Sequence, residues 1–397
     1  MQNQKESKPV FEINLKPWER MPENFDAIAE AIRRGSYLPM PERPETGTFY
    51  RLYPEGCVSG NGTAYHGGIR IGEEADKLLI YFNGGGVSFD EYTAARPWNL
   101  FTLNADEKDT YYSNDGEWTG DYFLSKGLNA RRDDNPFLKW SCINLLYCNG
   151  DFHSGDGEFE YTAQDSSRQI MPYHGYRNAM ATIRLAMKYL PSPTTIVIAG
   201  SSAGGFGAAM LAEDIIGLFP ECGNITLAVD SSLIVSDRWK DVAEHVWHTP
   251  EHIRRRLVSG NIVLDCMADL YKKHRNHIKY LFLCSVRDAL LTVAQNAIDG
   301  KGQTHTLADG IAFEERLQNM CADLRNSIPE IGLFVFSAPM DAPGYDADHL
   351  TLHCILNNPS LFDLFVGDMN ASEWLMNAVN GTIDCRGMEL LEKERNH

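Results

Sequence analysis

The sequence predicts an α/β fold with a mainly parallel central sheet and helices on both of its faces. Apolar runs of strand length, among them 78–82, 196–199 and 280–284, alternate along the chain with segments of helical periodicity. Few polar residues interrupt these runs, which is typical of parallel strands that are buried on both faces. The alternation therefore places the strands in one sheet between two helical layers.

The domain organisation follows from length and composition. Of the 397 residues, 43 % are hydrophobic and 23 % are charged, which is enough to bury a sizeable core. A chain of this length can hold one large domain or two, and we expect a single domain over 46–397. Inserted segments are expected at about 101–135 and 234–278. Residues 1–45 are rich in Pro, Glu and Lys and are expected to form an N-terminal surface arm.

The charge balance disfavours two classes of partner. Thirty-six basic residues stand against 54 acidic ones, a net charge of −18. The basic clusters 254–256 and 272–275 lie in helix-like stretches and are interpreted as solvated faces. Nucleic acids and anionic membranes are therefore poor partners.

The location of the protein is predicted from what its sequence lacks. No apolar run approaches the length of a transmembrane helix, and the first ten residues lack the apolar core of a signal peptide. We expect a cytoplasmic protein, with a secreted protein whose signal has been removed as the alternative. Nine cysteines, none in a Cys-x-x-Cys pair, favour small buried side chains of a reduced compartment over a disulfide framework.

The individual elements follow in order. Strands are predicted at 48–53, 77–83, 140–148, 196–199, 225–230, 280–284 and, as the last strand, 331–337. Helices are predicted at 174–190 and at 307–328. A third helix is predicted after the turn that follows the strand at 196–199. The stretch 234–278 is mostly helical in pattern and is interpreted as a lid or cap. The stretch 101–135 is polar and aromatic and is interpreted as an insertion that borders a cleft.

The strand at 196–199 runs directly into Gly200–Ser201–Ser202–Ala203–Gly204. Strand, Gly-x-Ser-x-Gly and helix together are the pattern of a sharp turn that exposes the hydroxyl of its central serine. Glycines on both sides let the backbone take this turn without a Cβ clash. Ser202 is therefore the candidate nucleophile, although a Gly/Ser-rich turn without chemistry is the alternative.

Two further loops carry candidate groups. Gly84, Gly85 and Gly86 follow the buried strand at 77–83 and are placed to present backbone N–H groups to an oxyanion, with a flexible turn as the alternative. The loop 149–156 contains two carboxylates and a histidine, which is a possible metal-ligand set, but polar loops of this kind are common. We therefore predict neither a metal nor a cofactor.

The candidates for the catalytic acid and base lie C-terminal to Ser202 in the sequence. Asp288 follows the strand at 280–284 and is favoured as the acid over Asp230, which ends the strand at 225–230. His349 and His353 are both candidates for the base, since their spacing puts them on one face if the segment is helical. A zinc pair is disfavoured because the accompanying glutamate is missing. The order Ser, Asp, His is that of α/β-hydrolases, which defines the expected fold class as α/β-hydrolase-like.

Several stretches resemble one family of α/β-hydrolases, the pectin acetylesterases and the related Notum-type carboxylesterases. The resemblance is carried by 83–86, 147–156, 200–205, 285–288 and 353–354, and spans about residues 77–356. It implies Ser202 as nucleophile, Asp288 as acid and His353 as base, since the family's histidine is often followed by a cysteine, here Cys354. It also implies an oxyanion hole formed by the backbone of Gly85, Gly86 and Ala203.

The chain departs from the family pattern at two places. Val87–Ser88 stand where the family often has Trp-Cys after its glycines, and Ser201 stands where the family often has Cys. Loss of the tryptophan bears on the substrate preference. The absence of these cysteines fits a chain that is not built for export.

The combined expectation is a serine carboxylester hydrolase that works through an acyl-enzyme. The resemblance implies removal of O-acetyl groups from acetylated carbohydrates. A net charge of −18 repels a polyanion such as de-esterified pectin, so oligosaccharide or small-molecule esters are the expected substrates. The alternatives are a Notum-type carboxylesterase for longer acyl chains and a hydrolase-fold protein that binds a ligand without catalysis.

Overall fold

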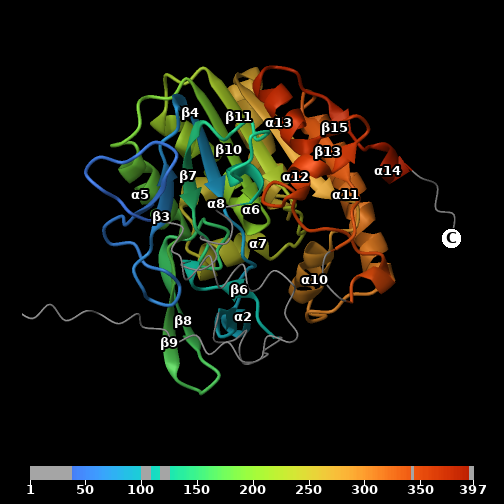
Figure 1. Ribbon diagram of the computed structural model, residues 1–397. Coiled ribbons are helices and arrows are strands. Elements are labelled where there is room, and N and C mark those ends of the chain that lie inside the picture. The colour runs from blue at the N-terminus through green and yellow to red at the C-terminus, as the bar shows by residue number, and fades with distance from the viewer. Residues whose placement is uncertain (1–37, 100–108, 117–125, 341–343, 393–397) are drawn as a thin grey trace, which may run out of the picture.

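A computed structural model describes residues 38–99, 109–116, 126–340 and 344–392 (Figure 1). Its centre is a ten-stranded sheet. In spatial order the strands are β1 (Leu38–Pro39), β2 (Phe49–Leu52), β3 (Gly67–Arg70), β7 (Trp140–Leu145), β4 (Glu74–Phe82), β10 (Thr195–Ser201), β11 (Asn224–Asp230), β12 (Ile278–Ser285), β13 (Gly332–Phe336) and β16 (Cys385–Arg386).

The sheet is mainly parallel, as predicted. All neighbouring pairs from β7 to β16 are parallel, whereas β3 is antiparallel to both β7 and β2. The central strands are continuous apolar runs because both of their faces are covered. On β4, for example, Leu78 and Ile80 belong to one core, and Leu79 and Tyr81 belong to the other.

Helices cover both faces of the sheet, which confirms the α/β-hydrolase-like fold class. The first core is shared with helices α5 (Gly175–Ala186), α6 (Ala203–Leu218), α9 (Ile262–His274), α10 (Ala289–Ile298) and α11 (Leu307–Ser327). The second core is shared with α12 (Ser360–Asp363) and α13 (Ala371–Val379). The strand and helix segments predicted from the apolar runs are confirmed, with ends that differ by a few residues.

Both ends of the sheet differ from the prediction. The strand at 331–337 is not the last, because β16 pairs in parallel with β13 beyond it. Leu38 and Pro39, expected to belong to a surface arm, form β1 beside β2. A strand of two residues is too short to show the alternation that identifies a strand, so β1 and β16 give no periodic signal. Residues 1–37 of the predicted arm lie outside the described residues.

The predicted helical stretch 234–278 is built from short pieces followed by one long helix. The pieces are α7 (Trp239–Asp241), a π-helical turn η3 (Val242–Val246) and α8 (Glu251–Arg254). The long helix α9 packs against α6 within the helical layer. Arg256, expected on a solvated face, is instead buried and donates from Nη2 to the carbonyl oxygen of Met210 at 2.7 Å.

Several smaller elements lie outside the central sheet and its main helices. They include the hairpin β8 (Gly157–Thr162) and β9 (Arg168–Tyr173), which projects from the body in Figure 1, the pairs β5 (Pro97–Trp98) with β6 (Tyr112–Ser113) and β14 (Phe365–Val366) with β15 (Met369–Asn370), helices α2 (Glu91–Ala94) and α14 (Glu389–Glu392), and the 3₁₀ turns η2 (Gly127–Asn129), η4 (Arg275–His277) and η5 (Asp346–Asp348).

Two global observations concern the described residues alone. None of their helices has the length and apolar character needed to cross a membrane. All nine cysteines lie in the described ranges and are free thiols, and all except Cys222 and Cys385 are buried.

Candidate active site

The candidate catalytic side chains come from four neighbouring strands. Ser202 follows β10, Asp230 ends β11, Asp288 follows β12, and His353 lies in the long connection after β13. Because β10, β11, β12 and β13 are parallel neighbours, their carboxyl ends lie at one edge of the sheet. The fold therefore delivers residues that are far apart in sequence to the same place.

Ser202 occupies the strained turn that the sequence predicts. Its backbone has φ 57° and ψ −129°, a conformation that costs free energy for a residue with a side chain. A Cβ atom on Gly200 would lie 2.2 Å from the carbonyl oxygen of Gly204, and one on Gly204 would lie 2.0 Å from that of Phe82. Both glycines are thus required by the close approach of strand, turn and helix.

His353 is paired with Asp288, the favoured acid. Its Nδ1 lies 2.8 Å from Oδ1 and 2.9 Å from Oδ2 of Asp288, whose side chain is fully buried. Since Nδ1 donates to the carboxylate, Nε2 of the neutral ring is left as an acceptor. Burial lowers the pKa of His353, but the charge and hydrogen bond of Asp288 outweigh this effect and leave the pKa raised.

His349, the other candidate for the base, is placed differently. The connection at this point is a 3₁₀ turn, η5, and not an α-helix, so the argument that both histidines share a helical face does not apply. His349 itself adopts a left-handed backbone conformation with φ 53° and has an exposed side chain. His353 is the histidine that the structure brings to Asp288.

Asp230, the rival acid, makes no hydrogen bond to His353 in the described part of the chain. Its Oδ2 instead accepts from the Ser201 hydroxyl at 2.9 Å and from the N–H groups of Ile355 and Leu356 at 2.9 and 2.8 Å. Burial raises its pKa to about 6, although these hydrogen bonds act in the opposite direction. Asp230 therefore binds the segment next to the histidine rather than the imidazole ring.

The glycine loop lies against the nucleophile turn. A Cβ atom on Gly84 would lie 2.7 Å from Cβ of Ser202, so only glycine permits this approach. Gly86 has φ 82°, and a Cβ atom there would lie 2.1 Å from the carbonyl oxygen of Tyr111. Gly85 and Gly86, two of the residues predicted to form the oxyanion hole, directly follow Gly84, the glycine that lies against Ser202. Ala203, the third, is the first residue of α6, and the first N–H groups of a helix have no partner within the helix.

Three donors hold the carbonyl groups of this loop. The His153 ring bonds from Nε2 to the carbonyl oxygen of Asn83 at 2.8 Å, and the Tyr147 hydroxyl donates to that of Gly86 at 2.8 Å. The N–H of Ser113 donates to the carbonyl oxygen of Gly85 at 2.8 Å. Each carbonyl bond fixes the plane of its peptide, and thereby the direction of the next N–H group.

The loop 149–156, with its possible metal-ligand set, uses its polar groups internally. Asp151 is fully buried and accepts from the N–H groups of His153 and Gly175 at 3.1 and 2.8 Å, and Asp156 pairs with Arg177 at 2.9 Å. Burial raises the pKa of Asp151 to about 7 and lowers that of His153 to about 4. The described residues contain no group of three or more His, Cys, Asp or Glu side chains placed to hold a metal ion.

Sequence reasoning missed the supporting role of His153 and Tyr147. Both lie in the stretch 147–156 that carries the family resemblance, but their contacts join residues 70 and 61 positions apart. The sequence did contain one indication of this role: a histidine and a tyrosine next to a buried strand need hydrogen-bond partners for their polar atoms.

Residues 55–274 match the family model described as Pectinacetylesterase. This range is more than half of the 397 residues. The chain belongs to the pectinacetylesterase family. The range matched by the pectinacetylesterase model includes the glycine loop and Ser202, whereas Asp288 and His353 lie beyond its end.

A curated relative agrees with membership of the pectinacetylesterase family. Pectin acetylesterase 11 of Arabidopsis thaliana is 23 % identical over 181 residues, which are 45 % of this chain and 42 % of the relative. The chain thus spans less than half the length of that relative in the match.

Two crystal forms of the Wnt deacylase Notum from Drosophila share the fold. One has a TM-score of 0.55 at 16 % identity and covers 84 % of this chain and 94 % of its own. The other has a TM-score of 0.51 at 15 % identity and covers 82 % and 91 %.

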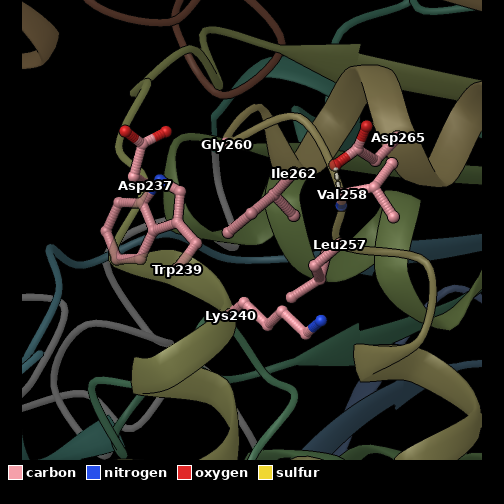
Figure 2. A pocket seen from close by; sticks show the side chains of 8 residues that line it. All are labelled: Asp237, Trp239, Lys240, Leu257, Val258, Gly260, Ile262 and Asp265. Atoms are coloured by element: carbon pink, nitrogen blue, oxygen red, sulfur yellow. Dashed lines mark hydrogen bonds between the residues drawn. The ribbon is translucent and has the colours of Figure 1, made fainter.

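A cavity of about 110 Å³ in this pectinacetylesterase-family chain lies apart from the candidate catalytic residues (Figure 2). It is lined by Trp239, Lys240 and Asp265 among others, and by none of the candidate catalytic residues. Asp265 uses Oδ2 to accept from the N–H groups of Val258 and Ser259 at 2.7 and 2.9 Å. This carboxylate therefore stabilises a turn and does not face the candidate active site.

Proposed function

We propose that the chain is a serine carboxylester hydrolase that removes O-acetyl groups from acetylated carbohydrates. The observation that carries the proposal is the His353–Asp288 pair, with Nδ1 2.8 Å from the buried carboxylate, at the sheet edge where the Ser202 turn also lies. A nucleophile, a base and an orienting acid in this chain order are the parts that acyl transfer requires.

The mechanism assigns one role to each group. His353 accepts the Ser202 proton at Nε2 as the serine oxygen attacks the ester carbonyl, and Asp288 holds the ring in the tautomer that allows this. The protonated imidazole then gives its proton to the departing alcohol, which leaves an acetyl-enzyme. Water, activated by the same histidine, releases acetate and restores the serine.

The oxyanion of each tetrahedral intermediate needs donors that are already oriented. We assign these to the N–H groups of Gly85, Gly86 and Ala203, supported by the contact between the glycine loop and Ser202. The bonds from His153, Ser113 and Tyr147 to the loop carbonyls keep its peptides from turning. Preorganised donors of this kind contribute about 3–4 kcal/mol each to the transition state.

The acetylated-carbohydrate substrate is supported by the family and by charge. The Arabidopsis relative is named as a pectin acetylesterase, whereas the Notum structures are those of a Wnt deacylase. A net charge of −18 opposes approach of a polyanionic polysaccharide at low ionic strength. Neutral acetylated oligosaccharides or small acetylated compounds are therefore the substrates we propose.

The first experiment compares wild type with Ser202→Ala and Asp288→Asn on p-nitrophenyl acetate and on acetylated oligosaccharides. Both variants are expected to lose about 10³-fold or more in kcat, because one lacks the nucleophile and the other no longer holds the required tautomer. Asp265→Asn removes a buried carboxylate away from the site and serves as the matched control.

Two outcomes would replace the proposal. A wild-type preference for octanoyl over acetyl esters, with no acetate released from any sugar, would favour a lipid deacylase. No labelling of Ser202 by a fluorophosphonate, together with tight binding of a carbohydrate, would favour a binding protein without catalysis.

A further inference from the structure

Asp230 lies beside the nucleophile strand and is not used in the proposed mechanism. It is the last residue of β11, and its register partner on β10 is Ser201, the residue before the nucleophile. Its side chain is fully buried. A buried carboxylate is costly unless it is hydrogen-bonded, so its partners define what it does.

The carboxylate joins two segments that the mechanism needs to keep together. On one side it accepts from the Ser201 hydroxyl, which also bonds to the Tyr81 hydroxyl at 2.7 Å. On the other side it accepts from the N–H groups of Ile355 and Leu356, the second and third residues after His353. Residues 353–356, which we call the base segment, are thereby tied to β10, the strand that ends just before Ser202.

A second tie runs through Ser231. Its hydroxyl donates to Oδ1 of Asp230 at 3.1 Å and accepts from the N–H of Cys354 at 3.1 Å. Three successive backbone N–H groups after His353 are thus bound to Asp230, either directly or through Ser231. Cys354 itself has φ 64°, so the chain turns sharply at the point where these bonds hold it.

The charge of Asp230 also reaches the imidazole. In the described part of the chain, the titratable groups that feel the charge of Asp230 include Tyr81 from β4, Cys284 from β12, and His353 and Cys354 from the base segment. Among these, His353 is the one that becomes positive. The negative charges of Asp288 and Asp230 both favour its protonated form.

We propose that Asp230 is a positioning residue for the esterase reaction, which fixes the His353 segment to the nucleophile strand and stabilises the imidazolium by its negative charge. This inference rests on the proposed function, because it describes the same site. It gives the two carboxylates separate tasks: Asp288 orients the ring of His353, and Asp230 orients the backbone that carries it.

The variant Asp230→Asn separates charge from shape. An amide oxygen at the Oδ2 position still accepts from Ser201, Ile355 and Leu356, and the amide nitrogen can donate to the Ser231 hydroxyl. The acid limb of kcat/KM is expected to move to lower pH by less than about one unit, since the negative charge is lost and Asp230, with a pKa of about 6, carries only part of that charge over this limb in wild type. kcat is expected to fall about three- to tenfold, and KM to stay unchanged.

Asp265→Asn is the matched control. Figure 2 shows Asp265 with its hydrogen bond to Val258, in a cavity that no candidate catalytic residue lines. Like Asp230, it is a buried carboxylate that accepts from two backbone N–H groups. Its replacement is expected to lower the melting temperature and to leave the acid limb unmoved.

A second variant tests the tie without the charge. Ser201→Ala removes one donor and keeps the carboxylate, so kcat is expected to fall about fivefold, since the lost hydrogen bond is of the order of 1 kcal/mol. This variant decides the positional part even if Asp230→Asn does not fold. A wild-type kcat in Ser201→Ala would overturn it.

NMR titration of the His353 ring, assigned by comparison with His353→Gln, reads the charge effect without activity. A lower imidazole pKa in Asp230→Asn than in wild type supports the inference even if no ester is hydrolysed, in which case the proposed function alone fails. An active wild type, with the same acid limb and the same imidazole pKa in Asp230→Asn, overturns the inference and leaves the proposed function standing.

Discussion

Thr351 and Arg287 bind each other through two hydrogen bonds. The N–H of Thr351 donates to the carbonyl oxygen of Arg287 at 2.9 Å, and the N–H of Arg287 donates to Oγ1 of Thr351 at 3.0 Å. Thr351 also donates from Oγ1 to the Ser285 hydroxyl at 2.9 Å, and its carbonyl oxygen accepts from Ala289. The loop that carries Asp288 and the loop that carries His353 are thereby joined side by side.

Replacement of Thr351 by Val tests this junction. The methyl group cannot accept from Arg287 or donate to Ser285, so the free energy of unfolding is expected to fall by about 1–3 kcal/mol. kcat is expected to fall as well, because the Asp288–His353 distance is no longer fixed. Denaturant unfolding and kcat for p-nitrophenyl acetate measure both effects.

The control for Thr351 is Thr182→Val. Thr182 is also buried, but its Oγ1 donates to the carbonyl oxygen of Asn178 within α5. This variant is expected to change stability without changing kcat. An equal loss of kcat in the two variants would argue against a specific role of Thr351.

His153→Phe tests the support of the glycine loop. The variant keeps an aromatic ring beside Phe82 and Tyr147 but loses the donor to the Asn83 carbonyl group. If the loop presents the oxyanion donors, kcat falls by about tenfold or more while KM for a small ester stays near the wild-type value. His66→Phe, at a buried histidine before β3, is the comparison, and the idea fails if both variants retain full kcat.

Asp151→Asn tests a pH dependence of stability. Burial raises the folded-state pKa of Asp151 to about 7, above its value of about 3.9 in an unfolded chain. The folded state therefore binds a proton that the unfolded state releases, and the stability that this proton contributes is lost as pH rises from about 4 to 7. The variant cannot titrate there, so its melting temperature is expected to decline less between pH 5 and 8 than that of wild type.

His153 acts in the opposite direction over part of this range. Burial lowers the pKa of His153 to about 4, below its value of about 6.5 in an unfolded chain. The stability that the neutral ring contributes is therefore present above about pH 6.5 and is lost as pH falls from about 6.5 to about 4. Both wild type and Asp151→Asn contain His153, so its contribution cancels when the melting temperatures of the two proteins are subtracted at each pH. Parallel melting curves of the two proteins over pH 5–8 would contradict a raised pKa for Asp151.

Much of the fold follows from local patterns. The run at 196–199, the glycines on both sides of Ser202 and the helix after them each predict one state, and together they define strand, turn and helix. The place of Asp288 shortly after a strand is also predictable, because the short apolar run 280–284 ends a few residues before it. In such places local propensity and tertiary structure require the same residues.

What the sequence left open depends on long-range contacts. Asp288 and Asp230 differ in their hydrogen-bond partners, which lie 65 and about 125 positions away and which no local pattern reveals. His349 and His353 are both candidates because their spacing puts them on one face of a helix, and the 3₁₀ turn η5 stands where that helix is assumed. The resemblance favoured His353 through Cys354, but the pairing itself is visible only in the folded chain.

The ten-stranded sheet ends on both sides in strands of two residues, Leu38–Pro39 and Cys385–Arg386. Pro39 has no backbone N–H, so β1 offers few donors at this end of the described sheet. Long exposed edges are the usual templates on which a second chain extends a sheet and begins aggregation. Terminal strands of only two residues offer little length for such pairing, so in the described part of the chain the large sheet presents short edges to a second chain.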